Sequence, residues 1–175
     1  MRIQIILLSL ILGGCTGIPE GVNPVTNFST QKYLGKWYEI ARLDHSFERG
    51  LDKVTAEYSL RDDGGIRVVN KGYSIQSGKL KEAQGKAYFV GDRQIGHLKV
   101  SFFGPFYGSY VVFDLDRENY QYAFVAGYNK SYLWLLSRTP EVDQGLVDKF
   151  INESRKLGFD TNGLVFVNHN KIERK

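Results

Sequence analysis

The stretch VTAEYSL, residues 54–60, alternates apolar and polar side chains without a break, and LKVSF, residues 98–102, does the same. A period of two is typical of a β-strand with one buried face. Less strict runs predict six further strands, and turn-forming Gly, Asp, Asn and Pro residues separate them. The eight predicted strands are residues 37–43, 54–60, 66–74, 85–90, 98–102, 110–114, 120–127 and 132–138.

The even spacing and short connections of these strands favour an eight-stranded antiparallel up-and-down barrel, because closure removes exposed strand edges. A two-sheet sandwich is the alternative. One α-helix follows, with Thr139 as its expected N-cap and Pro140 at its first position. A short ninth strand is predicted at residues 164–168. The fold class is therefore mostly β, with one C-terminal helix.

Composition limits the range of functions. The 175 residues, 42% of them hydrophobic and 24% charged, suit one soluble domain with a core. The net charge of +4 comes from scattered residues without a long Lys/Arg block, so nucleic-acid binding is not favoured. The single cysteine, Cys15, excludes an intrachain disulfide and a zinc site made of several thiolates. The three histidines are far apart, so we expect neither a metal nor a cofactor.

The N-terminus has the features of an export signal. Arg2 precedes an apolar run at residues 3–12, which is too short for the ~20 residues that a membrane-spanning helix needs. The run ends in LGGC, residues 12–15, which resembles the lipobox of bacterial lipoproteins. That resemblance implies cleavage before Cys15, a diacylglycerol on its sulfur and an acyl chain on its new amino group. A plain signal peptide with an incidental cysteine is the alternative.

Three segments are expected on this basis. Residues 1–14 form a lipoprotein signal peptide, residues 15–31 a lipidated tether with two prolines and no periodic pattern, and residues 32–175 the barrel domain. Thr16 stands where lipoproteins kept at the inner membrane usually carry Asp. The expected location is therefore the outer membrane, with the lipid-anchored chain facing the periplasm.

Three short motifs point to a family. GKWY, residues 35–38, begins the first strand, Arg138 ends the eighth, and residues 114–122 turn between the sixth and seventh. Together they resemble the signature regions of the lipocalins, and the lipobox makes the chain most similar to the bacterial lipocalins of the outer membrane. The second motif departs from the family, since RENY at residues 117–120 replaces its usual Thr-Asp-Tyr form. The resemblance implies a structural role for Gly35, Trp37, Tyr122 and Arg138.

The barrel itself gives a physical reason for one of these pairings. In an up-and-down barrel, the first strand starts at the end where the eighth finishes, so Trp37 and Arg138 lie together. A sheltered guanidinium over an indole contributes roughly 1–2 kcal/mol. The remaining donors of Arg138 can bind carbonyls of the N-terminal segment. We expect these residues to close the barrel and to catalyse nothing.

Strand alternation then selects a cavity lining. If Trp37 points inward, so do Glu39 and Ala41, and the same parity applied to the other strands gives an apolar interior with several Tyr hydroxyls. A barrel filled by its own side chains is the alternative. The predicted ligand-lining residues are Glu39, Tyr58, Val68, Asn70, Val100, Phe102, Tyr110, Tyr132 and Trp134.

Such a cavity suits an acyl chain, and few cations are expected inside it. Several basic residues lie in segments expected at the open end of the barrel, namely Arg49, Lys53, Lys79, Lys81 and Lys130. An anionic head group would therefore stay at the mouth. The family resemblance implies fatty acids or lysophospholipids as ligands, held or transported in the cell envelope, with the membrane as a second partner. A homodimer is compatible with the sequence.

Two other classes of function stay open. One is an envelope interaction module with an empty barrel. The other, less favoured, is an enzyme acting on a hydrophobic substrate, and we predict that the chain is not an enzyme. The only thiol is expected to be lipidated, and the sequence has no Gly-x-Ser-x-Gly motif. The apolar loop FGPFY, residues 103–107, could touch the membrane, cap a ligand or pack on itself.

Overall fold

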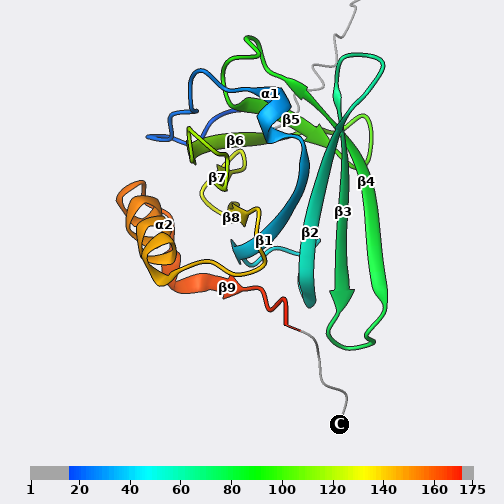
Figure 1. Cartoon of the computed structure of the whole chain (residues 1–175), viewed down its shortest axis with the longest axis vertical. Helices are drawn as coiled ribbons and strands as arrows, with labels where there is room; N and C mark the ends of the chain where they lie inside the picture. Colours follow the sequence, from blue (N-terminus) through cyan, green and yellow to red (C-terminus); the bar gives the residue numbers. More distant parts are fainter. Residues whose placement is uncertain (1–15, 171–175) are drawn as a thin grey trace, which may run out of the picture.

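A computed structural model describes residues 16–170 and confirms the eight-stranded antiparallel barrel (Figure 1). Each strand pairs with its neighbours in sequence, and β1 pairs with both β2 and β8 to close the sheet. The strands are β1 (Gly35–Leu43), β2 (Leu51–Leu60), β3 (Ile66–Ser74), β4 (Leu80–Phe89), β5 (His97–Ser101), β6 (Gly108–Leu115), β7 (Tyr122–Ala126) and β8 (Leu133–Ser137). A ninth strand, β9 (Leu164–Phe166), pairs with the end of β1.

The N-terminal segment covers one end of the barrel. A single helical turn, α1 (Thr30–Tyr33), which the sequence analysis did not predict, lies beside the start of β1 (Figure 1). Ahead of it, the backbone of Val25 donates to Val112 O and accepts from the N–H of Gly96, both at 2.8 Å. Phe28 is buried. The described part of the predicted tether is therefore packed on the barrel through main-chain bonds and apolar side chains.

The C-terminal helix begins later than predicted. α2 spans Gln144–Lys156, and its N-cap is Asp143, whose carboxylate accepts from the N–H of Leu146 at 2.9 Å. The prediction of Thr139 as the N-cap is wrong, because the hydroxyl of Thr139 donates to Glu141 O at 2.7 Å and caps no helix. Asp is a stronger cap than Thr, and the residues between β8 and Asp143 carry the chain to the outside of the barrel. A short 3-10 turn, η1 (Thr161–Gly163), leads into β9.

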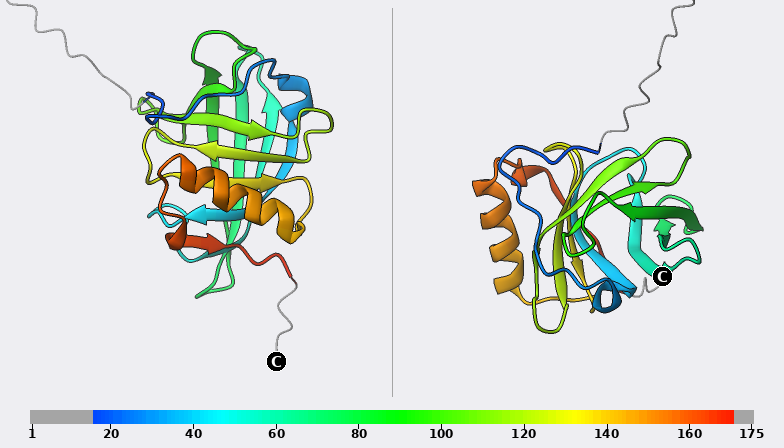
Figure 2. Two further views of the ribbon diagram at one scale, coloured as in Figure 1. Left: turned by 90° about the vertical axis from the view of Figure 1, so that its left-hand side faces the viewer. Right: turned by 90° about the horizontal axis from the view of Figure 1, so that it is seen from above.

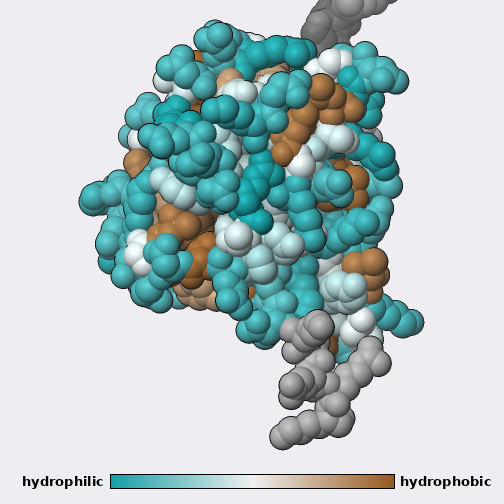
Figure 3. Space-filling model, in the orientation of Figure 1, coloured by the Kyte–Doolittle hydropathy of each residue, from teal (hydrophilic) through white to brown (hydrophobic). Residues whose placement is uncertain are grey.

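Two apolar cores result. One lies inside the barrel around Trp37, and the other lies between the barrel wall and α2. In the outer core the rings of Phe124 and Phe150, both fully buried, are 5.0 Å apart. Figure 2 shows α2 lying across the outside of one wall, and Figure 3 shows hydrophobic residues between helix and barrel on a mostly hydrophilic face. Within residues 16–170 no helix is long and apolar enough to cross a bilayer.

A β-bulge changes the parity of β1. Glu39 pairs with Leu136, but Ala41 pairs with Leu135, so one residue is inserted at Ile40. Ile40 and Ala41 both pack in the outer core, and the prediction that Ala41 faces the cavity is wrong. The next residue, Arg42, is 2% exposed and contacts Glu39. The bulge therefore puts a cation on the inner side of the wall, where the sequence analysis expected few.

Candidate functional site

The barrel encloses two apolar spaces. The inner one has a volume of about 100 Å³ and the outer one, at the open end, about 560 Å³. Asn70, Val100 and Trp134 line both, so the two spaces adjoin. The combined cavity falls in the size range of small-molecule sites.

Every residue of the predicted lining faces this cavity. All but Tyr132 line the inner space, whereas Tyr132 lines the outer one. The parity of β2, β3, β5, β6 and β8 thus follows the alternation read from sequence. That these side chains bind a ligand stays a prediction.

Three tyrosines form a hydroxyl cluster in the inner space. The hydroxyl of Tyr110 is 2.6 Å from that of Tyr33 and 3.0 Å from that of Tyr58. Burial raises the pKa of all three hydroxyls above the usual Tyr value, and their mutual repulsion raises the pKa of Tyr33 and Tyr110 further. These groups therefore stay uncharged at neutral pH, and this cluster offers hydrogen bonds without charge.

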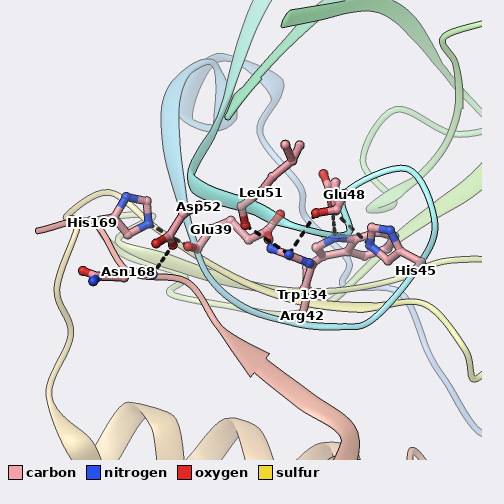
Figure 4. A network of polar contacts seen from close by, with 9 residues as sticks. All are labelled: Glu39, Arg42, His45, Glu48, Leu51, Asp52, Trp134, Asn168 and His169. Carbon is pink, nitrogen blue, oxygen red and sulfur yellow. Dashed lines mark hydrogen bonds and ion pairs between the residues drawn. The ribbon is translucent and has the colours of Figure 1, made fainter. Parts of the chain in front are cut away.

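A second cluster of polar residues surrounds the buried side chain of Arg42 (Figure 4). Arg42 Nη1 donates to Glu39 Oε1 at 2.6 Å, and its Nη2 donates to the carbonyls of Glu48 and Leu51 at 3.0 and 3.2 Å. The loop between β1 and β2 therefore folds back over the guanidinium. Arg42 is thus held by its own chain and is not presented to a ligand.

The carboxylate of Glu48 is held by groups from two elements. Its Oε2 accepts from Trp134 Nε1 at 3.1 Å and lies 3.0 Å from His45 Nε2 (Figure 4). The ring of His45 stacks on Phe47 with centroids 3.9 Å apart. The wall at β8 and the β1–β2 loop are therefore joined at the cavity mouth.

The two glutamates have opposite protonation tendencies. Burial raises the pKa of Glu39, the negative charge of Glu48 raises it further, and Arg42 only partly offsets them. Burial also disfavours ionised Glu48, but its bonds from His45 and Trp134 and the charge of Arg42 outweigh this and lower its pKa. The cluster consequently favours the negative charge on Glu48, which His45 and Trp134 hold, over a negative charge on Glu39.

This arrangement predicts unequal effects for one substitution. Glu48→Gln should lower the free energy of unfolding by ~2 kcal/mol, because it removes the negative charge that His45 and Trp134 hold near buried Arg42. Glu39→Gln should cost clearly less, since the amide resembles the protonated acid. Urea unfolding at neutral pH compares the two variants. Equal losses, or a larger loss for Glu39→Gln, would contradict this charge assignment.

The closed end is built as the motifs predicted. The guanidinium of Arg138 lies 3.8 Å from the indole centroid of Trp37, which is fully buried. Arg138 also donates to the carbonyls of Lys32, Leu34, Lys36 and Tyr120 at 2.7–3.2 Å. Gly35 has φ +93°, where a side chain would be strained, and a Cβ there would lie 3.5 Å from Nη1 of the same guanidinium.

Tyr122, predicted with this group, lies elsewhere. Its hydroxyl accepts from Lys149 Nζ at 2.6 Å, on the helix side of the barrel. Tyr120 takes the position at the closed end instead, where its hydroxyl accepts from the N–H of Ser29 at 2.9 Å. The turn before it is organised by Asp116, whose carboxylate accepts from three backbone N–H groups.

The sequence analysis missed Arg42, His45 and Glu48. A bulge shows no signal in the alternation of apolar and polar residues, and the β1–β2 loop has no periodicity that would place Glu48 over the cavity. The predicted lipidation site, Cys15, lies outside the described residues. Within residues 16–170 no group of His, Asp and Glu side chains could hold a metal ion.

Known proteins share this sequence over most of its length. The profile of the lipocalin-like domain matches residues 28–169. A protein of Vibrio cholerae called outer membrane lipoprotein Blc is 66% identical over 165 residues, which are 94% of this chain and 96% of the relative. The protein of the same name in Escherichia coli K12 is 53% identical over 149 residues, which are 85% and 84% of the two chains.

Solved structures share the fold at much lower identity. Insecticyanin from the tobacco hornworm Manduca sexta superposes with a TM-score of 0.70 at 21% identity, over 89% of this chain and 88% of that protein. Lobster apocrustacyanin A1 gives a TM-score of 0.66 at 22% identity, over 88% and 94%. At these identities the likeness concerns the barrel alone.

Proposed function

Since this chain belongs to the lipocalin family, we propose that its barrel holds or transports fatty acids or lysophospholipids in the bacterial envelope. The chain is a lipid-anchored lipoprotein of the outer membrane, like the relatives that carry that name. The ligand class and the transport role are our proposal. The observation that carries it is an apolar cavity of two adjoining spaces, the outer of which lies at the open end of the barrel.

The walls of this cavity favour an acyl chain. Apolar side chains such as Val54, Val68, Leu98 and Val100 line it, and transfer of methylene groups from water onto such walls yields roughly 0.8 kcal/mol each. The tyrosine hydroxyls at its inner end are uncharged and bonded to one another. A buried head group with a full charge would lose its solvation there.

A charged head group is therefore expected at the mouth. The inward cation, Arg42, is paired with Glu39 and bonded to the backbone carbonyl of Glu48, so it does not attract an anion into the barrel. Lys81 and Lys71 line the outer space, although Lys71 lies 3.2 Å from Glu82. These positions favour an anionic head group at the open end with its tail inside.

Identification of the bound lipid tests the proposal directly. The full chain is purified from outer membranes, extracted with organic solvent and analysed by mass spectrometry. We expect single-chain lipids in an amount close to that of the protein, and far less from a variant whose cavity is blocked. A barrel that carries no lipid and binds none when titrated would favour the empty interaction module instead.

Binding is favoured over catalysis by how the polar groups are held. The carboxylate of Glu48 accepts from Trp134 and lies against His45, and Arg42 is held by Glu39 and by backbone carbonyls. These bonds fix each group to the protein. They leave no evident pairing of a nucleophile with a free base around the cavity among the described residues.

Replacement of Cys15 tests the anchor. Cys15→Ser should abolish lipidation and leave the chain unprocessed or soluble, because the thiol is the expected acceptor of the diacylglycerol. Membrane fractionation and the intact mass of the product measure both effects. Thr16→Ser is the matched control, since it changes the neighbouring residue and keeps the thiol. A Cys15→Ser chain that is cleaved before residue 15 and stays in the outer membrane would disprove the assignment.

A further inference from the structure

Large aromatic side chains are exposed around the open end of the barrel. Phe103 is 80% exposed, Phe106 70% and Phe47 57%. All three line the outer space of the cavity, and we call them the aromatic rim. Exposed apolar residues that gather in one place mark an interaction surface more often than scattered ones do.

The N-terminus of the described chain is fixed close to this rim. The carbonyl of Thr16 lies 3.1 Å from His97 Nε2 and accepts from the hydroxyl of Ser109 at 3.4 Å. Phe106 is three residues before Ser109, and three residues span at most ~10 Å. Thr16 thus lies within a short distance of the β5–β6 loop, which carries two of the three rim residues.

This position restricts how a lipid-anchored chain can lie on a membrane. Cys15 is the residue before Thr16, so acyl chains on Cys15 would put the bilayer surface next to Ser109. Residues after Thr16 follow the barrel, with Val25 and Phe28 bonded to it, and they provide no long free linker. The short connection therefore brings the β5–β6 loop to the bilayer.

We propose that the aromatic rim docks on the phospholipid bilayer, so that the mouth of the barrel faces the membrane that holds the anchor. The inference rests on the proposed lipidation of Cys15 and does not depend on the identity of the ligand. Aromatic side chains favour the boundary between acyl chains and head groups. Lys81, which lines the same opening, and Lys99, whose ammonium lies 5.1 Å from the ring of Tyr107, suit the anionic surface of such a bilayer.

Fluorescence quenching can locate the rim relative to the bilayer. The full lipidated chain with Phe103→Trp is placed in vesicles of phosphatidylethanolamine and phosphatidylglycerol, with or without bromine on the acyl chains. The signal of the unsubstituted chain, which contains Trp37 and Trp134, is subtracted. The added tryptophan should shift to shorter wavelength and lose at least half of its emission in the brominated vesicles.

Leu60→Trp is the matched control, because Leu60 is exposed and ends β2 at the closed end. It should keep nearly all of its emission in brominated vesicles. Quenching of Phe103→Trp no stronger than that of Leu60→Trp would overturn the proposal. So would a blue shift of Phe103→Trp that grows with protein concentration in solution without vesicles, since a second copy would then cover the rim.

Two checks separate this inference from its premises. The intact mass of the chain shows whether Cys15 is lipidated, and an unlipidated chain would overturn the docking proposal together with the anchor. The lipid content of the same preparation reports the ligand proposal independently. Circular dichroism confirms folding, and both substitutions are at exposed positions that should tolerate tryptophan. A quenched rim on a barrel without ligand would support docking while the ligand proposal fails.

Discussion

Trp37→Ala should lower the free energy of unfolding by about 3–5 kcal/mol, the usual cost of removing a large buried aromatic side chain. Trp37 is fully buried, and its indole N–H donates to the carbonyl of Tyr33 at 2.8 Å. The ring also lies 4.9 Å from that of Tyr33 and beneath the guanidinium of Arg138. Its removal therefore opens a cavity at the point where α1, β1 and β8 meet.

A double-mutant cycle with Arg138→Ala isolates the contact between the two side chains. Arg138→Ala should cost less than Trp37→Ala, although it leaves four backbone carbonyls without their donor. Urea unfolding followed by circular dichroism gives the four free energies. We expect a coupling of roughly 1–2 kcal/mol from the sheltered cation–π contact. A coupling of zero would mean that the short distance has no energetic consequence.

Val100→Asp should weaken binding of a fatty acid at least ~10-fold, which corresponds to ~1.4 kcal/mol or more. Val100 lines both spaces of the cavity, so a carboxylate there must either lose solvation beside the acyl chain or take up a proton. Titration with a fluorescent fatty acid, followed by energy transfer from Trp134, measures the affinity.

Val69→Asp is the control for that experiment. It makes the same chemical change on the same barrel, but Val69 follows inward-facing Val68 on β3 and lines neither space. Its affinity should stay within about twofold, which is under ~0.5 kcal/mol. If both variants fold by circular dichroism and bind equally poorly, the ligand does not occupy the interior.

The contrast between β3 and β1 shows what alternation can predict. β3 keeps an unbroken register with β4, and its register with β2 is regular from Ile66 to Lys71, so a period of two places Val68 and Asn70 inside. β1 carries the bulge at Ile40, and alternation fails for every residue after it, Ala41 and Arg42 included. A bulge depends on the pairing of two strands, which the sequence of one strand does not contain.

Loops and caps show the same limit. The β1–β2 loop buries Glu48 through contacts with His45 and Trp134, and Trp134 is far away in sequence. The sequence predicted that α2 starts after Thr139, whereas the path of the chain after β8 moves the start to Asp143. Local patterns therefore gave the strands and the closed end, whereas the polar mouth of the cavity required the tertiary structure.

Helix α2 supports one wall of the barrel and leaves the side formed by β4 without that support. The helix is held on β6 and β7 by the ion pair of Lys149 with Asp114 and by the packing of Phe150 on Phe124. Among the described residues no such backing covers β4, whose first half, residues 80–84, is exposed throughout. Local opening is cheapest where few buried contacts are lost. A barrel that must widen to take in a molecule would therefore open at the β3–β4 hairpin, while the wall under α2 keeps its shape.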